Sequence, residues 1–142
     1  MGSGHARMFT NGSCPDFELT AICDINPDRL AACLKMIGNE CAKSGRDLPE
    51  IKTFTDAIEM LDAGILDAVT VAVPHYSHPK YVIAAIERGI HVVCEKPAGV
   101  YTKQVKEMNA VADRHPEVTF AMMFNQRTDC VYRKMKEIIS SG

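Results

Sequence analysis

The chain has 142 residues, of which 46% are hydrophobic and 24% charged, and its formal net charge is −2 at pH 7. This length suits one domain with a real core, and the balanced charge gives no support to a nucleic acid or a membrane surface as partner. No apolar run reaches the roughly 18 residues of a membrane span, and no signal-peptide pattern opens the sequence. The six cysteines are widely spaced without a Cys-x-x-Cys pair, which favours reduced thiols and a cytoplasmic protein over a disulfide framework or a metal site.

Apolar strand patterns alternate with amphipathic helix patterns along the chain. Residues 1–12 read as a glycine-rich turn entering a helix, and strands are predicted over residues 17–23, 51–54, 68–73, 90–94 and 118–124. The helices between them have predicted N-caps at Asn26, Thr55, Thr102 and Asp129. Strand–helix alternation with connections of βαβ length predicts an α/β fold built on a doubly wound parallel sheet.

The stretch from Gly89 to Gly99 ends a buried strand with Glu95, Lys96 and Pro97. In open α/β sheets, ligands bind just past the carboxyl ends of the strands. An amine at this point can donate to a substrate oxygen whose charge changes during hydride transfer, which makes Lys96 the candidate catalytic residue. A solvated ion pair at the strand end is the structural alternative.

Two features suggest a dinucleotide site near the start of the chain. Gly2 and Gly4 enter a helix, and glycines there let a backbone approach a pyrophosphate. Taken alone, without a strand before them, the glycines favour a flexible terminus instead. Asp24 ends a strand about 20 residues later, where an acid can bind the ribose 2′-hydroxyl of NAD. The alternative is a charge that stabilises a helix N-terminus, but Asn26 and Asp28 already serve that purpose, which favours the ribose role. A carboxylate repels a 2′-phosphate, so the sequence favours NAD over NADP.

Further polar residues follow the other strands. His75 and His78 come after Pro74 at a strand end and are expected to face the same crevice, as ligands or proton shuttles or simply as turn residues. Asn125 and Arg127 follow the last predicted strand and are candidate ligands for a polar or anionic substrate, or simply cap the sheet.

The Val-Pro-His-Tyr-Ser-His turn, the Glu95-Lys96-Pro97 motif and the Cys23–Pro27 segment together resemble the glucose–fructose oxidoreductase and inositol dehydrogenase family. The resemblance implies a Rossmann domain that binds NAD(P), with Lys96 near nicotinamide and substrate and with Asp24 at the adenosine ribose. It further implies a crevice lined by Pro74, His75, His78, Glu95 and Pro97. Family substrates are sugars, cyclitols and related polyols, and a homo-oligomer is expected for the full-length protein.

The chain departs from the family pattern at both ends. The apolar first strand and two glycines of Gly-x-Gly-x-x-Gly are missing before Gly2, and the C-terminal α/β domain that supplies an Asp-x-x-x-His pair is missing after Gly142. The sequence therefore predicts a Rossmann domain at residues 1–124, without its first strand, and the start of an interdomain connection at residues 125–142. The absent strand would lie between the strand ending at Asp24 and the one ending at Val73, so we expect a marginally folded chain with little or no activity alone.

Two other functions fit a doubly wound sheet with an acid after an early strand. A nucleotide-binding or redox-sensing module would have no chemistry of its own, and an S-adenosylmethionine enzyme would use the same acid. Neither function requires an amine after the strand that ends at Cys94, so Lys96 favours the oxidoreductase.

Overall fold

The computed structural model describes residues 1–142, in which six α-helices and five short strands alternate. In chain order these are α1 (Gly2–Thr10), β1 (Ala21–Cys23), α2 (Pro27–Ser44), β2 (Lys52–Phe54), α3 (Ala57–Asp62), β3 (Ala68–Val71), α4 (His78–Ile86), β4 (His91–Cys94), α5 (Thr102–Arg114), β5 (Phe120–Met122) and α6 (Cys130–Ser141). Single 3₁₀ turns at His75–Ser77 and Asn125–Arg127 follow β3 and β5.

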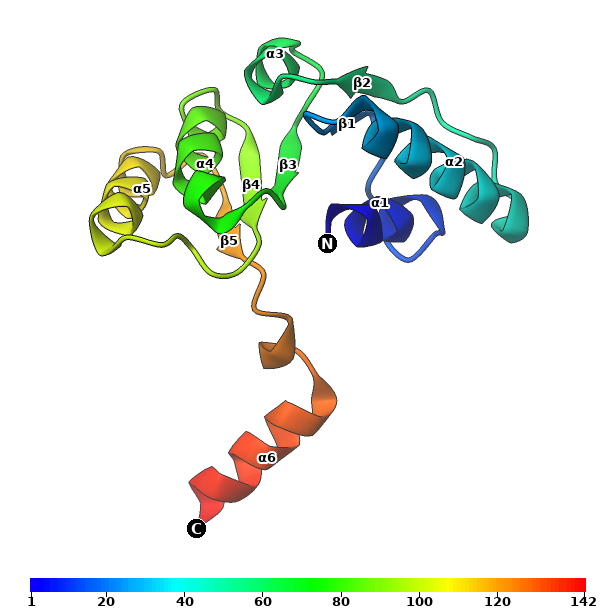
Figure 1. Ribbon diagram of the computed structural model, residues 1–142. Coiled ribbons are helices and arrows are strands. Elements are labelled where there is room, and N and C mark those ends of the chain that lie inside the picture. Colours follow the sequence, from blue (N-terminus) through cyan, green and yellow to red (C-terminus); the bar gives the residue numbers. More distant parts are fainter.

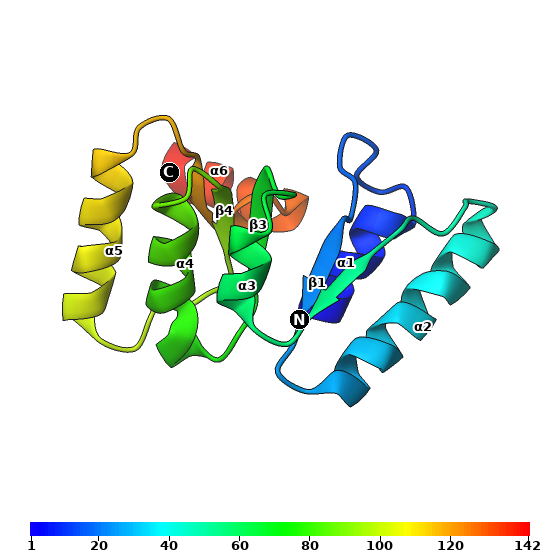
Figure 2. The ribbon, with the colours of Figure 1, turned by 90° about the horizontal axis from the view of Figure 1, so that it is seen from above.

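All strand pairs are parallel, which confirms the predicted α/β class. β1 pairs with β2, and β3, β4 and β5 form a separate three-stranded sheet in that order. No hydrogen-bonded pairing joins β1 to β3, and this is where the sequence predicts an absent strand. Figures 1 and 2 show the two sheets as neighbouring halves, with α1 and α2 on the side of β1.

Each half of the molecule has its own hydrophobic cluster. Helices α3, α4 and α5 lie side by side along the three-stranded sheet (Figure 2), and α4 is the central one. Eleven buried residues form this larger cluster, among them Val82, Ile86, Val92 and Met108. The smaller cluster, where α1 packs on α2, consists of Ala6, Ile37 and Cys41.

Side-chain caps explain where several helices begin. Asn26 accepts hydrogen bonds from the backbone N–H groups at the start of α2, and Asp129 does the same for α6, as predicted. The prediction of Thr55 as a cap was wrong, because the Asp56 carboxylate occupies that position for α3. The prediction of Thr102 as a cap was also wrong, because Thr102 is already helical. The extended residue before it is Tyr101, whose side chain forms no cap.

The strands are shorter than their apolar runs. The first observed strand covers Ala21–Cys23 rather than residues 17–23, and the last covers Phe120–Met122 rather than residues 118–124. A strand extends only as far as a neighbour can pair with it, and β1 is paired on one side alone. Apolar patterning therefore overestimated strand length at both places.

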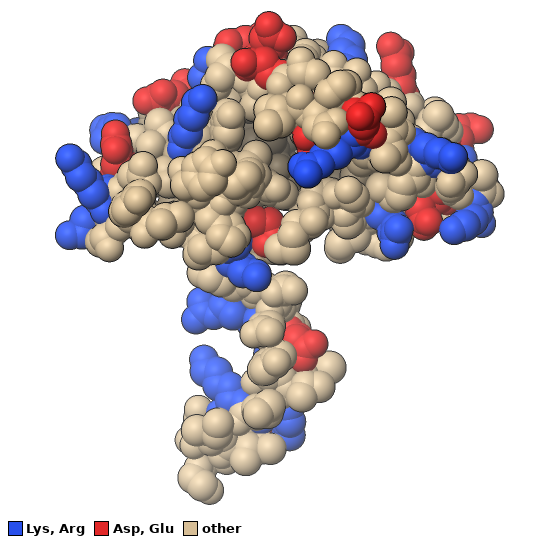
Figure 3. Space-filling view, viewed as in Figure 1, with Lys and Arg blue, Asp and Glu red and all other residues tan.

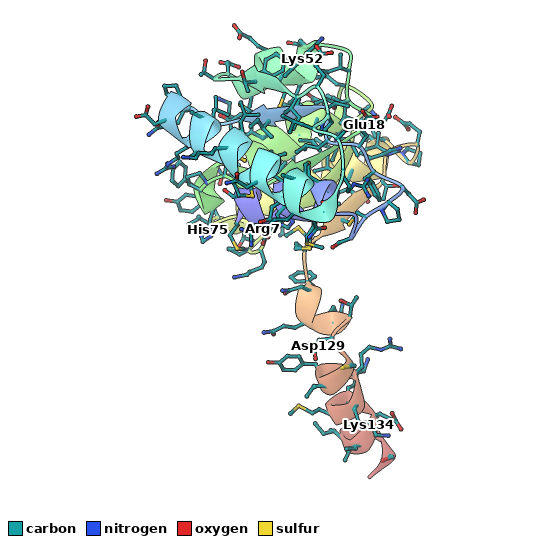
Figure 4. All side chains as sticks on the ribbon, turned by 90° about the vertical axis from the view of Figure 1, so that its right-hand side faces the viewer. Arg7, Glu18, Lys52, His75, Asp129 and Lys134 are labelled. Carbon is teal, nitrogen blue, oxygen red and sulfur yellow. The ribbon has the colours of Figure 1, made fainter.

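Helix α6 projects away from the rest of the molecule (Figure 1). Its apolar residues, which the helical spacing places on one side, are all exposed: Val131, Met135, Ile138 and Ile139. Lys and Arg side chains accompany them along this projecting segment (Figure 3), and Asp129 and Lys134 mark its course in Figure 4. None of the helices is both long enough and apolar enough to cross a membrane.

Candidate functional site

The predicted site residues follow the carboxyl ends of parallel strands. Asp24 follows β1, His75 follows β3, and Lys96 follows β4. Because parallel strands end at the same edge of a sheet, this edge is where an α/β fold presents ligand-binding groups. The first turn of α1, residues 2–5, contacts this edge through the His5 side chain, which is hydrogen-bonded to Glu95.

The start of α1 leaves open space beside its glycines. A Cβ atom added at Gly4 would meet no heavy atom within 4 Å, and one added at Gly2 would lie at an ordinary 3.7 Å from the Ala72 Cβ. The amides of Gly2 and Ser3 begin the helix, so no earlier turn of α1 supplies carbonyl groups for them. This first turn thus combines unpaired donors with room for an anion.

Asp24 is half-buried at the end of β1. Its Oδ1 accepts a hydrogen bond from the Asn26 amide at 2.9 Å, while Oδ2 lies 4.0 Å from the guanidinium of the exposed Arg29. Burial and then the charge of Asp24 raise the pKa of the Cys33 thiol, so the carboxylate acts on the helix behind it as well. Oδ2 remains available to a hydroxyl donor.

Glu95 is a buried carboxylate, 6% exposed, with a partner for each oxygen. The His5 ring donates from Nε2 to Glu95 Oε1 at 2.7 Å, and the Lys96 amide donates to Oε2 at 3.2 Å. A buried carboxylate requires such partners, and bonds to an ionised acceptor are the stronger kind. Glu95 was predicted to line the crevice, but both of its carboxylate oxygens already have hydrogen-bond partners within the protein.

Lys96 and Pro97 are exposed at the end of β4, and the peptide bond between them is cis. No hydrogen bond or ion pair holds the Lys96 amine, in contrast to its own backbone amide. The structure thus fixes the main chain at Lys96 while the amine faces solvent. This arrangement leaves the amine free to contact a ligand.

The predicted contact of His78 with a cofactor or substrate needs the clearest correction. Its ring is completely buried, with Nδ1 at 2.7 Å from the Pro97 carbonyl oxygen and Nε2 at 2.9 Å from the Val73 carbonyl oxygen. Neither nitrogen is left for a cofactor or substrate, so the predicted direct contact is wrong. The ring instead ties the end of β3 to the segment after β4.

His75 and Pro74 are exposed after β3, and Figure 4 shows His75 at the end of the body from which the α6 segment projects. The His75 and His78 rings lie edge to face, with centroids 5.6 Å apart. The two histidines predicted to act together therefore differ, because only His75 is accessible. Asn125 and Arg127 are exposed in the 3₁₀ turn that leads to α6.

His5 is the site residue that sequence reasoning missed. Its position one residue after Gly4 was visible, but its partner Glu95 lies 90 positions further along the chain. Nothing in a helical pattern indicates such a contact. The structure has no group of three or more His, Cys, Asp or Glu side chains arranged to hold a metal ion.

Cys94, which lies next to Glu95, is predicted to be a poor nucleophile. Burial, and then the adjacent Glu95 carboxylate, raise the pKa of the Cys94 thiol to about 11. At pH 8 only about one Cys94 side chain in a thousand is then a thiolate, which is the reactive form. In iodoacetamide labelling followed by peptide mass spectrometry, we expect the exposed Cys130 to react first and Cys94 last. Early labelling of Cys94 in the folded chain would contradict this order.

Comparison with known proteins identifies the family. The sequence model of the Gfo/Idh/MocA group, described as an oxidoreductase family with an NAD-binding Rossmann fold, matches residues 1–123. Inositol 2-dehydrogenase 3 of Saccharopolyspora erythraea is 28% identical over 142 residues, which cover 100% of this chain and 38% of that protein. The chain therefore spans well under half the length of this relative.

Solved structures show the same likeness. Myo-inositol 2-dehydrogenase from Lactobacillus plantarum superposes with a TM-score of 0.80 at 30% identity, covering 99% of this chain and 38% of that one. The WlbA dehydrogenase from Bordetella pertussis, solved with NADH and UDP-GlcNAcA, gives a TM-score of 0.76 at 27% identity, covering 98% and 38%. With the family match extending over most of its length, the chain belongs to the Gfo/Idh/MocA oxidoreductase family with its NAD-binding Rossmann fold.

Proposed function

We propose that this chain is the cofactor-binding part of an NAD-dependent dehydrogenase that acts on a carbinol carbon of a cyclitol, sugar or related polyol. The observation that carries the proposal is the exposed Lys96 amine, at a strand end whose main chain is fixed through Glu95 and Pro97. An accessible cation on a fixed backbone suits a group that must meet a reacting oxygen.

The residues around this strand end fit a dinucleotide. The open first turn of α1, with Gly2 and Gly4, offers amide donors and space to a pyrophosphate. Asp24 Oδ2 can accept from a ribose hydroxyl, and its charge disfavours a 2′-phosphate, which supports NAD over NADP. The exposed Pro74, His75 and Pro97 would line the remaining crevice. WlbA, solved with NADH, is consistent with this assignment.

When bound, NAD supplies a hydride acceptor at nicotinamide C4, and NADH supplies the donor. The protein's part is to orient the substrate oxygen. A Lys96 ammonium would donate a hydrogen bond to that oxygen and stabilise negative charge on it as the bond to carbon changes. Asn125 and Arg127 are proposed to bind further hydroxyl groups or an anionic substituent.

The proposed substrate class follows the names of similar proteins, and two of the three described above are inositol dehydrogenases. We also propose a homo-oligomer for the whole protein, with no nucleic-acid or membrane partner. A cytoplasmic location is proposed on the basis that all six cysteines are free thiols.

NADH binding is the experiment that tests this function. In a titration of the 142-residue chain followed by NADH fluorescence, we expect saturable binding that is weaker for NADPH. Asp24→Ala should weaken NADH binding about tenfold, because it removes a charged acceptor from a ribose hydroxyl. Asp28→Ala, which removes an exposed carboxylate four residues away on α2, should change the dissociation constant little.

The lysine is tested separately from the cofactor. We expect Lys96→Met to leave NADH affinity within a few-fold and to abolish any NADH oxidation seen with a keto-cyclitol. If neither this chain nor a version with an apolar strand and Gly-x-Gly restored before Met1 binds either nucleotide, the cofactor assignment fails. Equal binding of NADH by the parent and the Asp24→Ala variant would remove Asp24 from the ribose site.

A further inference from the structure

We propose that His5 is a positioning residue for Lys96, acting through the Glu95 carboxylate. The first turn of α1 and the end of β4 are then one mechanically linked unit rather than two separate parts of a site. The link to catalysis rests on the function proposed above, whereas the link between His5 and the Lys96 main chain stands on geometry alone.

The first step is the contact between His5 and Glu95. His5 is the fourth residue of α1, and its side chain is 16% exposed against 8% for that of Glu95. The Nε2–Oε1 distance of 2.7 Å is that of a strong, charge-assisted hydrogen bond. Apart from the contact with the Lys96 amide, it is the only hydrogen bond that the structure gives this buried carboxylate.

The second step runs from Glu95 to Lys96. Glu95 Oε2 accepts from the Lys96 amide at 3.2 Å, so the carboxylate lies between an imidazole and the backbone that carries the amine. The Glu95 backbone is fixed by its own amide, which donates to the Val71 carbonyl at 2.9 Å. With one oxygen released by loss of His5, the carboxylate could turn toward solvent and leave the Lys96 amide without its acceptor.

The third step concerns Pro97, the residue that follows Lys96. The Pro97 carbonyl is held by the buried His78 ring, so the residue after Lys96 already has a fixed partner. Lys96 therefore has one anchor on each side, and the anchor on the His5 side is the one that reaches α1. A nucleotide that orders the first turn of α1 would thereby also order Lys96, which no contact within β4 could achieve.

The test follows the Lys96 amide in nitrogen-15 correlation spectra of the 142-residue chain. We expect His5→Leu to move this amide proton upfield, because its hydrogen bond to a charged acceptor is weakened. His5→Gln should leave it near its original position, since a glutamine amide can reach Glu95 Oε1 from the same backbone site. A His5→Leu change made in a Glu95→Ala chain should have little further effect on Lys96.

A matched control comes from the second His–Glu pair. His115 Nδ1 lies 2.8 Å from Glu117 Oε1 on the exposed turn after α5, so His115→Leu removes a similar contact far along the chain from Lys96. This variant should not move the Lys96 amide. If His5→Leu loses the dispersed spectrum of a folded chain, His5→Asn replaces it, because the shorter amide does not reach the carboxylate.

Three results would overturn the proposal. These are an unmoved Lys96 amide in a folded His5→Leu or His5→Asn chain, an equal movement in His5→Gln, or a full movement that persists without Glu95. The NADH titration is a separate readout, in which His5→Leu should weaken binding about tenfold and His5→Gln should not. If neither the parent chain nor the version with the strand and Gly-x-Gly restored binds NADH, the proposed function fails, while the amide spectra still decide the role of His5.

Discussion

We expect His78→Leu to lower the free energy of unfolding by about 3 kcal/mol, measured by urea denaturation. The imidazole is completely buried between the Val73 and Pro97 carbonyl oxygens, at 2.9 Å and 2.7 Å from its two nitrogens. Leucine has a similar size but no N–H group, so the carbonyl group that accepts from the ring would lose its donor where water cannot easily replace it. The loss should exceed what the added apolar surface returns.

Two comparisons make this result specific to the hydrogen bonds. His78→Gln retains a donor and should recover part of the lost stability. His75→Leu changes an exposed histidine on the same turn and should stay within about 0.5 kcal/mol of the parent. A His78→Leu chain as stable as the parent would show that the ring is held by packing and that its two carbonyl contacts contribute little.

Local signals in the sequence predicted which helices and strands form better than they predicted where each one begins and ends. The Asn26-Pro27 start of α2 and the Asp129 cap of α6 were predicted because a short polar side chain acts on amides two or three residues away. The length of a strand depends on a neighbour that is distant in sequence, and so the ends of β1 and β5 were misjudged. The exposed apolar residues of α6 show the same limit, since an amphipathic pattern does not say what covers the apolar side.

The candidate site shows the same difference between what local sequence predicts and what only tertiary contacts decide. A turn after a strand was enough to place Asp24, His75 and Lys96 at the carboxyl edge, because strand direction fixes that edge. Whether a side chain at the edge faces solvent or the interior depends on contacts across elements. His78 turned inward to two carbonyl groups, and Glu95 is paired with His5 from α1. Both outcomes needed the tertiary structure.

The second large effect concerns the division of the molecule into two halves. Ile37 in α2 and Ile86 in α4 are both completely buried helical isoleucines, but they belong to different hydrophobic clusters. Changing either to alanine removes three carbon atoms and leaves a cavity, at a cost of about 3 kcal/mol to the structure that contains it. The clusters differ in size, since the one that contains Ile37 has three buried residues and the one that contains Ile86 has eleven.

Few contacts join the halves. No strand pairing crosses between β1 and β3, and the side-chain hydrogen bonds that do cross are His5 to Glu95 and a long 3.5 Å bond from Thr20 to the Ile65 carbonyl. Helix α3 adds packing contacts, because it lies against α4 and beside β1 and β2. Such sparse connections allow the smaller half to open without the larger one.

We therefore expect Ile37→Ala to have a regional effect on amide hydrogen exchange under native conditions. Amides of α1, α2, β1 and β2 should exchange faster by about two orders of magnitude, as about 3 kcal/mol implies, while those of β3, β4 and β5 should keep their protection. Ile86→Ala is the matched change in the larger cluster and should speed exchange in both halves, since the smaller half has little core of its own. Equal loss of protection across both halves in the Ile37→Ala chain would instead show one cooperative unit. In that case the His5–Glu95 contact and α3 would transmit stability across the whole molecule despite the missing strand pairing.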